Sequence, residues 1–296
     1  MNVRFIINPA SGRRRDLDRL GEAIARRCGR AGLAASVRRC DRKEDLDALV
    51  ADAKRERVEA LIAVGGDGTV HEIGTRLIDS PIALGILPAG SGNGLARHLG
   101  IPMDMVSALD AIASSRVEPV DTGLADGRPF LGVAGVGFDA EVAHRFGLRG
   151  KRGLETYVRE AILLLRGYRP ADYVVTVDGE TIRSRALLVT VANSSQYGNE
   201  ARIAPAASLR DGLLDVCILA DPPLLAVPLL LRRLFTGQLR DGSGVTIRRG
   251  RTIEIAREAA GKAHVDGEPI ELPARIRFTV HPGSLRILRP AGTRAI

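Results

Sequence analysis

The sequence predicts an α/β protein with a parallel-sheet domain at residues 1–122 and a β-rich antiparallel sandwich domain at residues 123–296, whose last strand could return to the first domain. Apolar strand-like segments alternate with helical segments before residue 122, which is typical of a parallel sheet. Short strand-like segments then follow one another directly, which favours antiparallel pairing. A length of 296 residues with 45% hydrophobic composition supplies two buried cores.

The first domain is expected to begin with a buried strand at residues 3–8, which ends in a turn that presents Asn8 and Ser11. The apolar periodicity then predicts helix 17–28, strand 34–39, helix 46–53, strand 60–64, a helix from residue 70, strand 81–87, helix 95–99 and helix 105–112. Strands joined through helices form a right-handed parallel sheet. The loops that follow these strands therefore gather at the carboxyl edge of the sheet.

The second domain is expected to contain many short strands and two helices. The strands are predicted at residues 130–136, 173–177, 182–191, 214–219, 245–247, 252–255, 275–280 and 285–288. One face of the first helix carries Leu154, Val158, Ile162 and Leu165. The second helix, at residues 224–235, is apolar nearly all round, so we expect it to be buried against the sheet. The alternative is contact with an anionic membrane, which Arg232 and Arg233 would favour.

Two glycine-rich loops follow neighbouring predicted strands. Residues 65–69 read Gly-Gly-Asp-Gly-Thr, and residues 90–94 read Gly-Ser-Gly-Asn-Gly. Glycines let backbone N–H groups approach a ligand closely, and a following helix N-terminus favours an anion. Asp67 would repel a phosphate unless a cation lay between them, and a magnesium nucleotide resolves that conflict. The loops therefore predict a phosphate site for a magnesium nucleotide.

Composition and charge exclude several classes of protein. The three cysteines include no CxxC pair and leave an odd thiol, which disfavours a disulfide framework or a zinc site. The net charge is +8, but the arginines are scattered and aromatic residues make up only 3% of the chain, so we expect no nucleic-acid partner. No apolar stretch reaches the roughly 20 residues that span a bilayer. Without a signal peptide either, the protein is expected to be cytoplasmic.

Several motifs occur in a fixed order along the chain. They are residues 65–69 with Glu72, Gly-Ser-Gly-Asn at 90–93, Asp-Thr-Gly at 121–123, Asp-Gly-Leu-Leu-Asp at 211–215 and Val-Asp-Gly-Glu at 265–268. This ordered set resembles the diacylglycerol kinase and sphingosine kinase catalytic family. The resemblance implies a bacterial soluble lipid kinase, with a nucleotide-binding domain like that of NAD kinases and phosphofructokinases, a β-rich lipid-substrate domain, and ATP in the cleft between them.

The resemblance also implies roles for single residues. Nucleotide contacts would come from Asn8, Ser11, Gly65, Gly66, Gly68, Thr69, Glu72, Gly90, Ser91, Gly92, Asn93 and Glu268. Glu72 would either support its loop or touch the ribose. Asp266 is the favoured general base, with Asp67 as the second candidate or as an organiser of magnesium. Asp211 resembles the ligand of a structural magnesium ion, and Asp121 is assigned to metal binding with it.

We therefore predict an ATP-dependent lipid kinase of phospholipid biosynthesis, placed in the cytoplasm or peripherally at the inner membrane surface. Its acceptor would be a hydroxyl of diacylglycerol, a sphingoid base, ceramide or a related lipid at the membrane surface. Gly94 stands where many relatives with diacylglycerol activity have an aspartate, so the lipid itself stays open.

Two alternative functions stay open beside this prediction. They are a soluble-substrate kinase resembling NAD kinase, and a nucleotide-binding or lipid-binding regulator without turnover. Dinucleotide oxidoreduction is disfavoured, because no acidic residue lies about 20 positions beyond Gly65 to hold a ribose. An exposed sheet edge could pair two copies into a homodimer.

Overall fold

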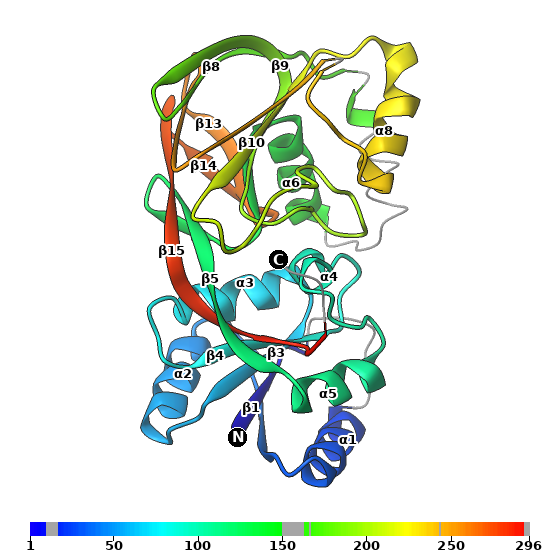
Figure 1. Ribbon diagram of the computed structural model, residues 1–296, viewed down its shortest axis with the longest axis vertical. Coiled ribbons are helices and arrows are strands. Elements are labelled where there is room, and N and C mark those ends of the chain that lie inside the picture. The colour runs from blue at the N-terminus through cyan, green and yellow to red at the C-terminus, as the bar shows by residue number, and fades with distance from the viewer. Residues whose placement is uncertain (10–16, 150–162, 166, 243, 293–296) are drawn as a thin grey trace. The chain divides into compact units, whose positions relative to one another are not determined.

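The computed structural model describes residues 1–9, 17–149, 163–165, 167–242 and 244–292 (Figure 1). The chain divides into two compact units, with Met1–Val120 and Gly283–Ile296 in unit 1 and Asp121–Pro282 in unit 2. Unit 1 is α/β with parallel strands and unit 2 is β-rich with antiparallel strands, which confirms the predicted fold class. Among the described residues, no helix has the length and apolar character needed to cross a bilayer.

The sheet of unit 1 places its parallel strands in the order β2, β1, β3, β4. Their bounds are Asn2–Ile7 for β1, Ala34–Arg39 for β2, Ala60–Gly65 for β3 and Ala83–Pro88 for β4. β3 and β4 are buried along their whole length, as expected of apolar strands covered on both faces. Gly65 pairs with Pro88 in the β3–β4 register, so the two loops that follow begin side by side.

Helices connect the strands of unit 1. They are α1 (Leu17–Arg30), α2 (Asp45–Arg55), α3 (Asp67–Arg76), α4 (Gly94–His98) and α5 (Met105–Ala113). Apolar residues at helical spacing face the sheet, as the buried Leu46, Val50 and Ala53 of α2 illustrate. The side chain of Asp104 caps α5 by accepting a hydrogen bond from the backbone N–H of Ser107 at 2.9 Å. α3 follows β3 and α4 follows β4 after a short loop, which puts both N-termini at the carboxyl edge of the sheet.

The strands of unit 2 pair antiparallel throughout the part of the chain that the structure describes. One path runs β14–β13–β7–β9–β8–β12, and β10 pairs with β9 and β11. The bounds are β6 Arg128–Phe130, β7 Val133–Gly137, β8 Ala171–Val177, β9 Glu180–Ala192, β10 Leu214–Ala220, β11 Val245–Gly250, β12 Thr252–Ala256, β13 Gly261–Val265 and β14 Glu268–Leu272. One core cluster contains Phe130 and Phe278 edge to face, and a second contains Leu188, Cys217 and Val245.

Asp-Gly dipeptides form tight hairpin turns in unit 2. Both residues of each turn have positive φ, which a type I′ turn requires. The turns are Asp126–Gly127 between β5 (Arg116–Ala125) and β6, Asp178–Gly179 between β8 and β9, and Asp266–Gly267 between β13 and β14. The same Asp-Gly sequence therefore forms all three hairpin turns, including the one that carries the predicted site residue Asp266.

Two strands run from one unit into the other. They are β5 (Arg116–Ala125) and β15 (Arg275–Arg289). The separate strands predicted at 275–280 and 285–288 are wrong, because β15 continues through Pro282 and Gly283. Gly283 has a φ of 60°, which lets the backbone turn while the strand's partner changes from β12 to β4. Ile287 pairs with Leu84 of β4 in unit 1.

The helix predicted at residues 224–235 is present in unit 2, whereas another helix was not predicted. α6 (Phe138–Arg149) follows β7 and was not predicted, whereas most of the predicted helix that ends near Leu165 lies outside the described residues. α8 (Val227–Thr236), preceded by the short 3₁₀ helix Leu224–Ala226, buries none of its residues, so the expectation of a buried helix is wrong. Leu230 and Leu234 pack on the second core cluster, but Leu229 stays 49% exposed.

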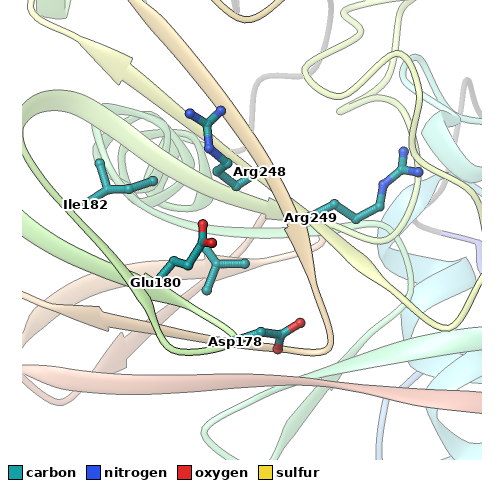
Figure 2. A pocket seen from close by; sticks show the side chains of 6 residues that line it. Asp178, Glu180, Ile182, Arg248 and Arg249 are labelled. Carbon is teal, nitrogen blue, oxygen red and sulfur yellow. The ribbon is translucent and has the colours of Figure 1, made fainter.

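A pocket of about 240 Å³ opens beside the β8–β9 hairpin of unit 2. Figure 2 shows Asp178, Glu180 and Ile182 of the hairpin across from Arg248 and Arg249 of β11. Neighbouring acids hold these arginines: Arg248 pairs with Asp241 at 3.1 Å and Arg249 with Asp215 at 3.2 Å. None of the predicted site residues lines this pocket.

Candidate functional site

The two glycine-rich loops of unit 1 meet at the carboxyl ends of β3 and β4. The backbone N–H of Ala89 donates to the carbonyl of Gly65 at 2.8 Å, which joins the loops where they start. Gly66 is the N-cap of α3 in extended conformation, and Asn93 is the N-cap of α4 with a φ of 54°. Two helix N-termini, each with a partial positive charge, therefore lie at one edge.

The Asp67 carboxylate links the first loop to the second. Its Oδ2 accepts from the backbone N–H of Asn93 at 2.8 Å, and its Oδ1 accepts from the N–H of Gly94 at 2.7 Å. The Asn93 side chain donates to the carbonyl of Gly90 at 2.9 Å and closes the second loop on itself. The Asp67 carboxylate, which lies among the predicted phosphate-binding groups, thus holds the N-terminus of α4. A carboxylate can accept more ligands than these two amides supply, so this bond and a cation are compatible.

The glycines of the two loops are required by this loop-to-loop contact. A Cβ at Gly90 would lie 2.5 Å from the Cα of Gly66, and a Cβ at Gly92 would lie 2.4 Å from Asp67 Oδ2. Within the first loop, a Cβ at Gly65 would lie 2.4 Å from Thr69 Oγ1. Prediction from the sequence assigned these glycines to close approach of a phosphate. The structure adds that they are needed before any ligand binds.

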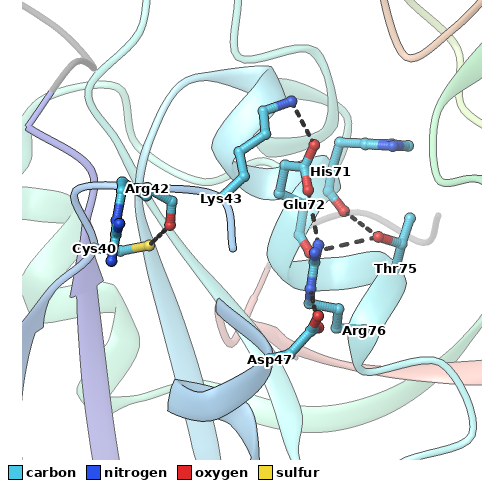
Figure 3. A network of polar contacts seen from close by, with 8 residues as sticks. All are labelled: Cys40, Arg42, Lys43, Asp47, His71, Glu72, Thr75 and Arg76. Carbon is cyan, nitrogen blue, oxygen red and sulfur yellow. Dashed lines mark hydrogen bonds and ion pairs between the residues drawn. The ribbon is translucent and has the colours of Figure 1, made fainter. Parts of the chain in front are cut away.

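Glu72 lies one turn into α3 and is held by two cations (Figure 3). Lys43 Nζ lies 2.6 Å from its Oε1 and Arg76 Nη1 lies 2.7 Å from its Oε2, while Arg76 also pairs with Asp47 at 2.6 Å. Burial acts to raise the pKa of Glu72, but hydrogen bonds and charges from Lys43 and Arg76 outweigh it and lower the pKa. This ion-pair network ties α3 to the start of α2. Both predicted roles of Glu72, support of its loop and contact with the ribose, stay predictions.

The remaining predicted residues of unit 1 are distributed around the loops. Asn8 follows β1, and its backbone N–H donates to the carbonyl of Val64 at 3.5 Å, which places it at the carboxyl edge with the loops. Gly68 and Thr69 lie in the first turn of α3, where Thr69 is buried. Ser91 is exposed at the tip of the second loop. Ser11 lies outside the described residues.

In unit 2, Asp266 is held by the segment that enters β7. Its carboxylate accepts backbone N–H groups from Leu131 at 2.8 Å, Gly132 at 2.7 Å and Val133 at 3.0 Å. Its own N–H donates to the carbonyl of Val133 at 2.7 Å. Three amide donors suit an ionised carboxylate and fix its orientation. Glu268, at the start of β14, pairs with Val265 across the same turn.

Asp121 and the Asp211 turn are brought together by the structure. Asp121 is buried, and its Oδ2 accepts from the backbone N–H of Gly212 at 2.7 Å. Asp211 accepts from its own turn at Leu213 N–H, 3.1 Å away, and lies 3.5 Å from Arg249. No group of three or more His, Cys, Asp or Glu residues within the described ranges is arranged to hold a metal ion. The two carboxylates therefore organise this turn, and magnesium binding by them stays a prediction.

A buried polar network beside Asp266 was missed by sequence analysis. Asp139 Oδ2 lies 3.1 Å from His264 Nε2, 2.6 Å from Thr190 Oγ1 and 3.1 Å from the Tyr197 hydroxyl. Asp139 and His264 are 6% and 2% exposed. They are separated by 125 residues, and no metal-ligand spacing marks His264, so no local signal could have joined them.

Comparison with known protein families covers both units. The family described as "Diacylglycerol kinase catalytic domain" matches residues 2–125. The family described as "YegS C-terminal NAD kinase beta sandwich-like domain" matches residues 132–289.

Whole proteins show the same similarity along most of their length. The chain is 26% identical to "Diacylglycerol kinase" of Bacillus subtilis over 271 residues, covering 90% of this chain and 89% of that protein. It is 32% identical to "Probable lipid kinase YegS-like" of Pseudomonas aeruginosa over 275 residues, covering 89% and 87%. A solved structure, "Crystal structure of a putative diacylglycerol kinase" from Bacillus anthracis, superposes with a TM-score of 0.80 at 22% identity over 98% of this chain and 97% of that chain. The structural likeness shows a shared fold.

Proposed function

The chain belongs to the diacylglycerol kinase catalytic-domain family and is a kinase, and from this premise we propose that it transfers the γ-phosphate of ATP to a hydroxyl group of a lipid. The observation that carries the proposal is the pair of glycine-rich loops joined through Asp67. It brings the two loops together at the N-terminus of α3, and a glycine-rich loop at a helix N-terminus is the environment that phosphates prefer.

The nucleotide assignment uses the loops of unit 1. Residues 65–69 and 90–93 would bind the phosphates of ATP through backbone N–H groups, while Asn8 would lie at the same edge. Glu72 would hold α3 in place through Lys43 and Arg76. Mg²⁺ bound to the triphosphate would neutralise charge on the transferring group. Asp67 is the carboxylate of this site that could hold the ion.

The acceptor chemistry needs one proton acceptor. As the lipid hydroxyl oxygen forms its bond to the γ-phosphorus, the bond to the leaving ADP oxygen breaks and the hydroxyl proton passes to a carboxylate. Asp266 is our first candidate because three amide donors hold its carboxylate in one orientation. Asp67 is the second candidate, and its carboxylate is held in a similar way by the backbone N–H groups of Asn93 and Gly94.

Contact with a lipid surface is assigned to α8. The helix is amphipathic, because Leu230 and Leu234 pack on the core while Leu229 and the preceding Leu225 are 49% and 95% exposed. The exposed Arg232 adds positive charge to the same helix. An exposed apolar surface with adjacent basic residues suits the headgroup region of an anionic bilayer.

Radiolabelled ATP tests the reaction. The protein is incubated with γ-labelled ATP, Mg²⁺ and, in separate reactions, vesicles with diacylglycerol, a sphingoid base or ceramide, or soluble NAD. Labelled lipid supports the proposal. Labelled NAD would replace it with a soluble-substrate kinase, and binding of ATP without any transfer would replace it with a regulator.

A matched pair of variants tests the acceptor residue. Asp266→Asn is expected to lower the rate of transfer by at least about a hundredfold with little change in ATP affinity. Asp178→Asn is the control, because Asp178 lies in an equivalent Asp-Gly hairpin and accepts the backbone N–H groups of Arg251 and Thr252 at 3.0 and 2.8 Å. If both variants lose activity equally, Asp266 is only a turn residue and the base moves to Asp67.

A further inference from the structure

His264 connects the candidate acceptor turn to a buried carboxylate. It lies on β13 two positions before Asp266, and the residue is 2% exposed. The backbone N–H of Gly267, inside the Asp266 turn, donates to His264 Nδ1 over a long 3.4 Å. On the other side of the ring, Nε2 lies 3.1 Å from Asp139 Oδ2. The imidazole therefore bridges the turn and Asp139.

These contacts select one tautomer of the ring. An N–H donor can only be accepted by a ring nitrogen without a hydrogen, so Nδ1 is the acceptor for Gly267. In this tautomer Nε2 carries the hydrogen and donates a hydrogen bond to Asp139. The other tautomer, with the hydrogen on Nδ1, would set two N–H groups against each other and break the bond to Gly267. The bridge is formed only with this tautomer.

Asp139 is itself fixed by several donors. Its Oδ1 accepts from the backbone N–H of Ala140 at 2.8 Å, at the start of α6. Its Oδ2 accepts from Thr190 Oγ1 at 2.6 Å, and the Tyr197 hydroxyl lies 2.6 Å from the Thr190 oxygen and 3.1 Å from Asp139 Oδ2. A buried carboxylate is costly unless donors surround it. Here the donors come from three different elements, which makes Asp139 a rigid anchor.

Gly135 of β7 leaves room for this pair. A Cβ at that position would lie 2.4 Å from Asp139 Oδ2 and 3.1 Å from His264 Nε2. His264 pairs with Gly135 in the β7–β13 register, and the amides that hold the Asp266 carboxylate belong to the segment entering β7. The Asp139–His264 contact, between the start of α6 and β13, therefore lies next to the pairing of β7 with β13, and the segment entering β7 supplies the Asp266 contacts.

We propose that Asp139 and His264 form a positioning pair that holds the Asp266 turn in the geometry needed for proton acceptance, with Thr190 and Tyr197 as its supports. This inference rests on the proposed lipid kinase function. Neither residue touches the reacting atoms. Their effect is transmitted through the Gly267 N–H to the peptide that orients the Asp266 carboxylate, and small displacements of a reacting group lower rates strongly.

Two substitutions separate the halves of the bridge. His264→Asn can still offer an oxygen near the Nδ1 position to Gly267 but cannot reach Asp139. His264→Gln can reach Asp139 but leaves the Gly267 N–H without its acceptor. His144→Gln is the control. His144 Nε2 lies 3.2 and 3.0 Å from the carbonyls of Ala263 and Ile270, which belong to the strands β13 and β14 on either side of the Asp266 turn.

The expected result is a split between kcat and KM. Both His264 variants should lower kcat for lipid phosphorylation by about tenfold to a hundredfold, with KM for ATP within about twofold of the parent. His144→Gln should leave both values within about twofold. A folded His264 variant with parental kcat, or one in which KM alone rises, would overturn the proposal.

Two further measurements keep the test decisive. Tyr197→Phe removes a single hydroxyl and should lower kcat by about twofold to fivefold. If the His264 variants do not fold, a parental kcat of Tyr197→Phe refutes the positioning pair. Amide hydrogen exchange at residues 131–133 should accelerate at least about tenfold in His264→Gln and not in His144→Gln. If the parent phosphorylates no lipid, the proposed function fails. The exchange rates then decide the positioning pair alone, and unchanged exchange refutes it.

Discussion

Substitution of Gly90 tests the contact between the two glycine-rich loops. The new Cβ of Gly90→Ala would lie 2.5 Å from the Cα of Gly66, 3.0 Å from Asn93 Oδ1 and 3.3 Å from the backbone N of Gly66. Two carbon atoms normally approach to about 3.5 Å, so one loop must move by about 1 Å. The obstacle is backbone and cannot rotate away. Gly90 does not have a positive φ, so the penalty is steric.

The magnitude follows from these contacts. Overpacking of this kind lowers the unfolding free energy by about 1–3 kcal/mol. A loss near 2 kcal/mol corresponds to a Tm that is lower by roughly 4–8 °C. A loop shift also lengthens the hydrogen bonds from Asn93 and Gly94 to Asp67, now 2.8 and 2.7 Å. Misplacement of phosphate-binding amides by about 1 Å should lower the transfer rate by about a hundredfold.

Thermal unfolding followed by circular dichroism, ATP titration calorimetry and the transfer assay measure the three effects. Gly21→Ala is the control, because nothing lies within 4 Å of a Cβ at that position of α1. It should raise the unfolding free energy by up to about 1 kcal/mol, since alanine favours helix over glycine. A Gly90→Ala protein with parental Tm and ATP affinity would refute the loop-to-loop contact.

Three further results are expected. Glu72→Gln should lower the unfolding free energy near neutral pH, because Lys43 and Arg76 lower the pKa of Glu72 in the folded state against the effect of burial. In urea titrations, the difference in unfolding free energy between variant and parent should shrink as the pH falls below about 5. A difference that stays constant with pH would contradict this prediction. Burial and neighbouring carboxylates raise the pKa of Cys217 to about 12, so iodoacetamide should label it only in denaturant, as mass spectrometry can check. Leu229→Glu should weaken flotation with anionic liposomes, whereas Val106→Glu, at a 51% exposed position of α5, should not.

Much of the fold could be predicted because its signals are local. Fully apolar segments such as β3 and β4 predict buried parallel strands, and glycine-rich segments indicate the loops that follow them. The α8 segment shows the limit of that reasoning. The segment is apolar nearly all round, but the burial of each side depends on the residues that pack against it. Leu229 is not among the residues that pack on the core clusters of the described chain. Periodicity alone does not reveal this.

The site was predicted in outline, and its internal contacts were not. Nothing local indicates that the Asp67 carboxylate bonds to the amides of Asn93 and Gly94, because an acid in a phosphate loop suggests a metal first. The Asp139–His264 contact joins residues 125 positions apart and is created by the pairing of β7 with β13. Such contacts depend on strand register, which the sequence specifies only through the completed fold.

The return of β15 to unit 1 has a consequence for biosynthesis. Leu285, Ile287 and Leu288 are buried in unit 1, and Arg289 pairs with Glu118 at 3.1 Å, although more than 160 residues separate them. A ribosome makes these residues after the whole of unit 2, because residues 121–282 precede them in the chain. The α/β unit can therefore complete its core only after the β-rich unit has been synthesised.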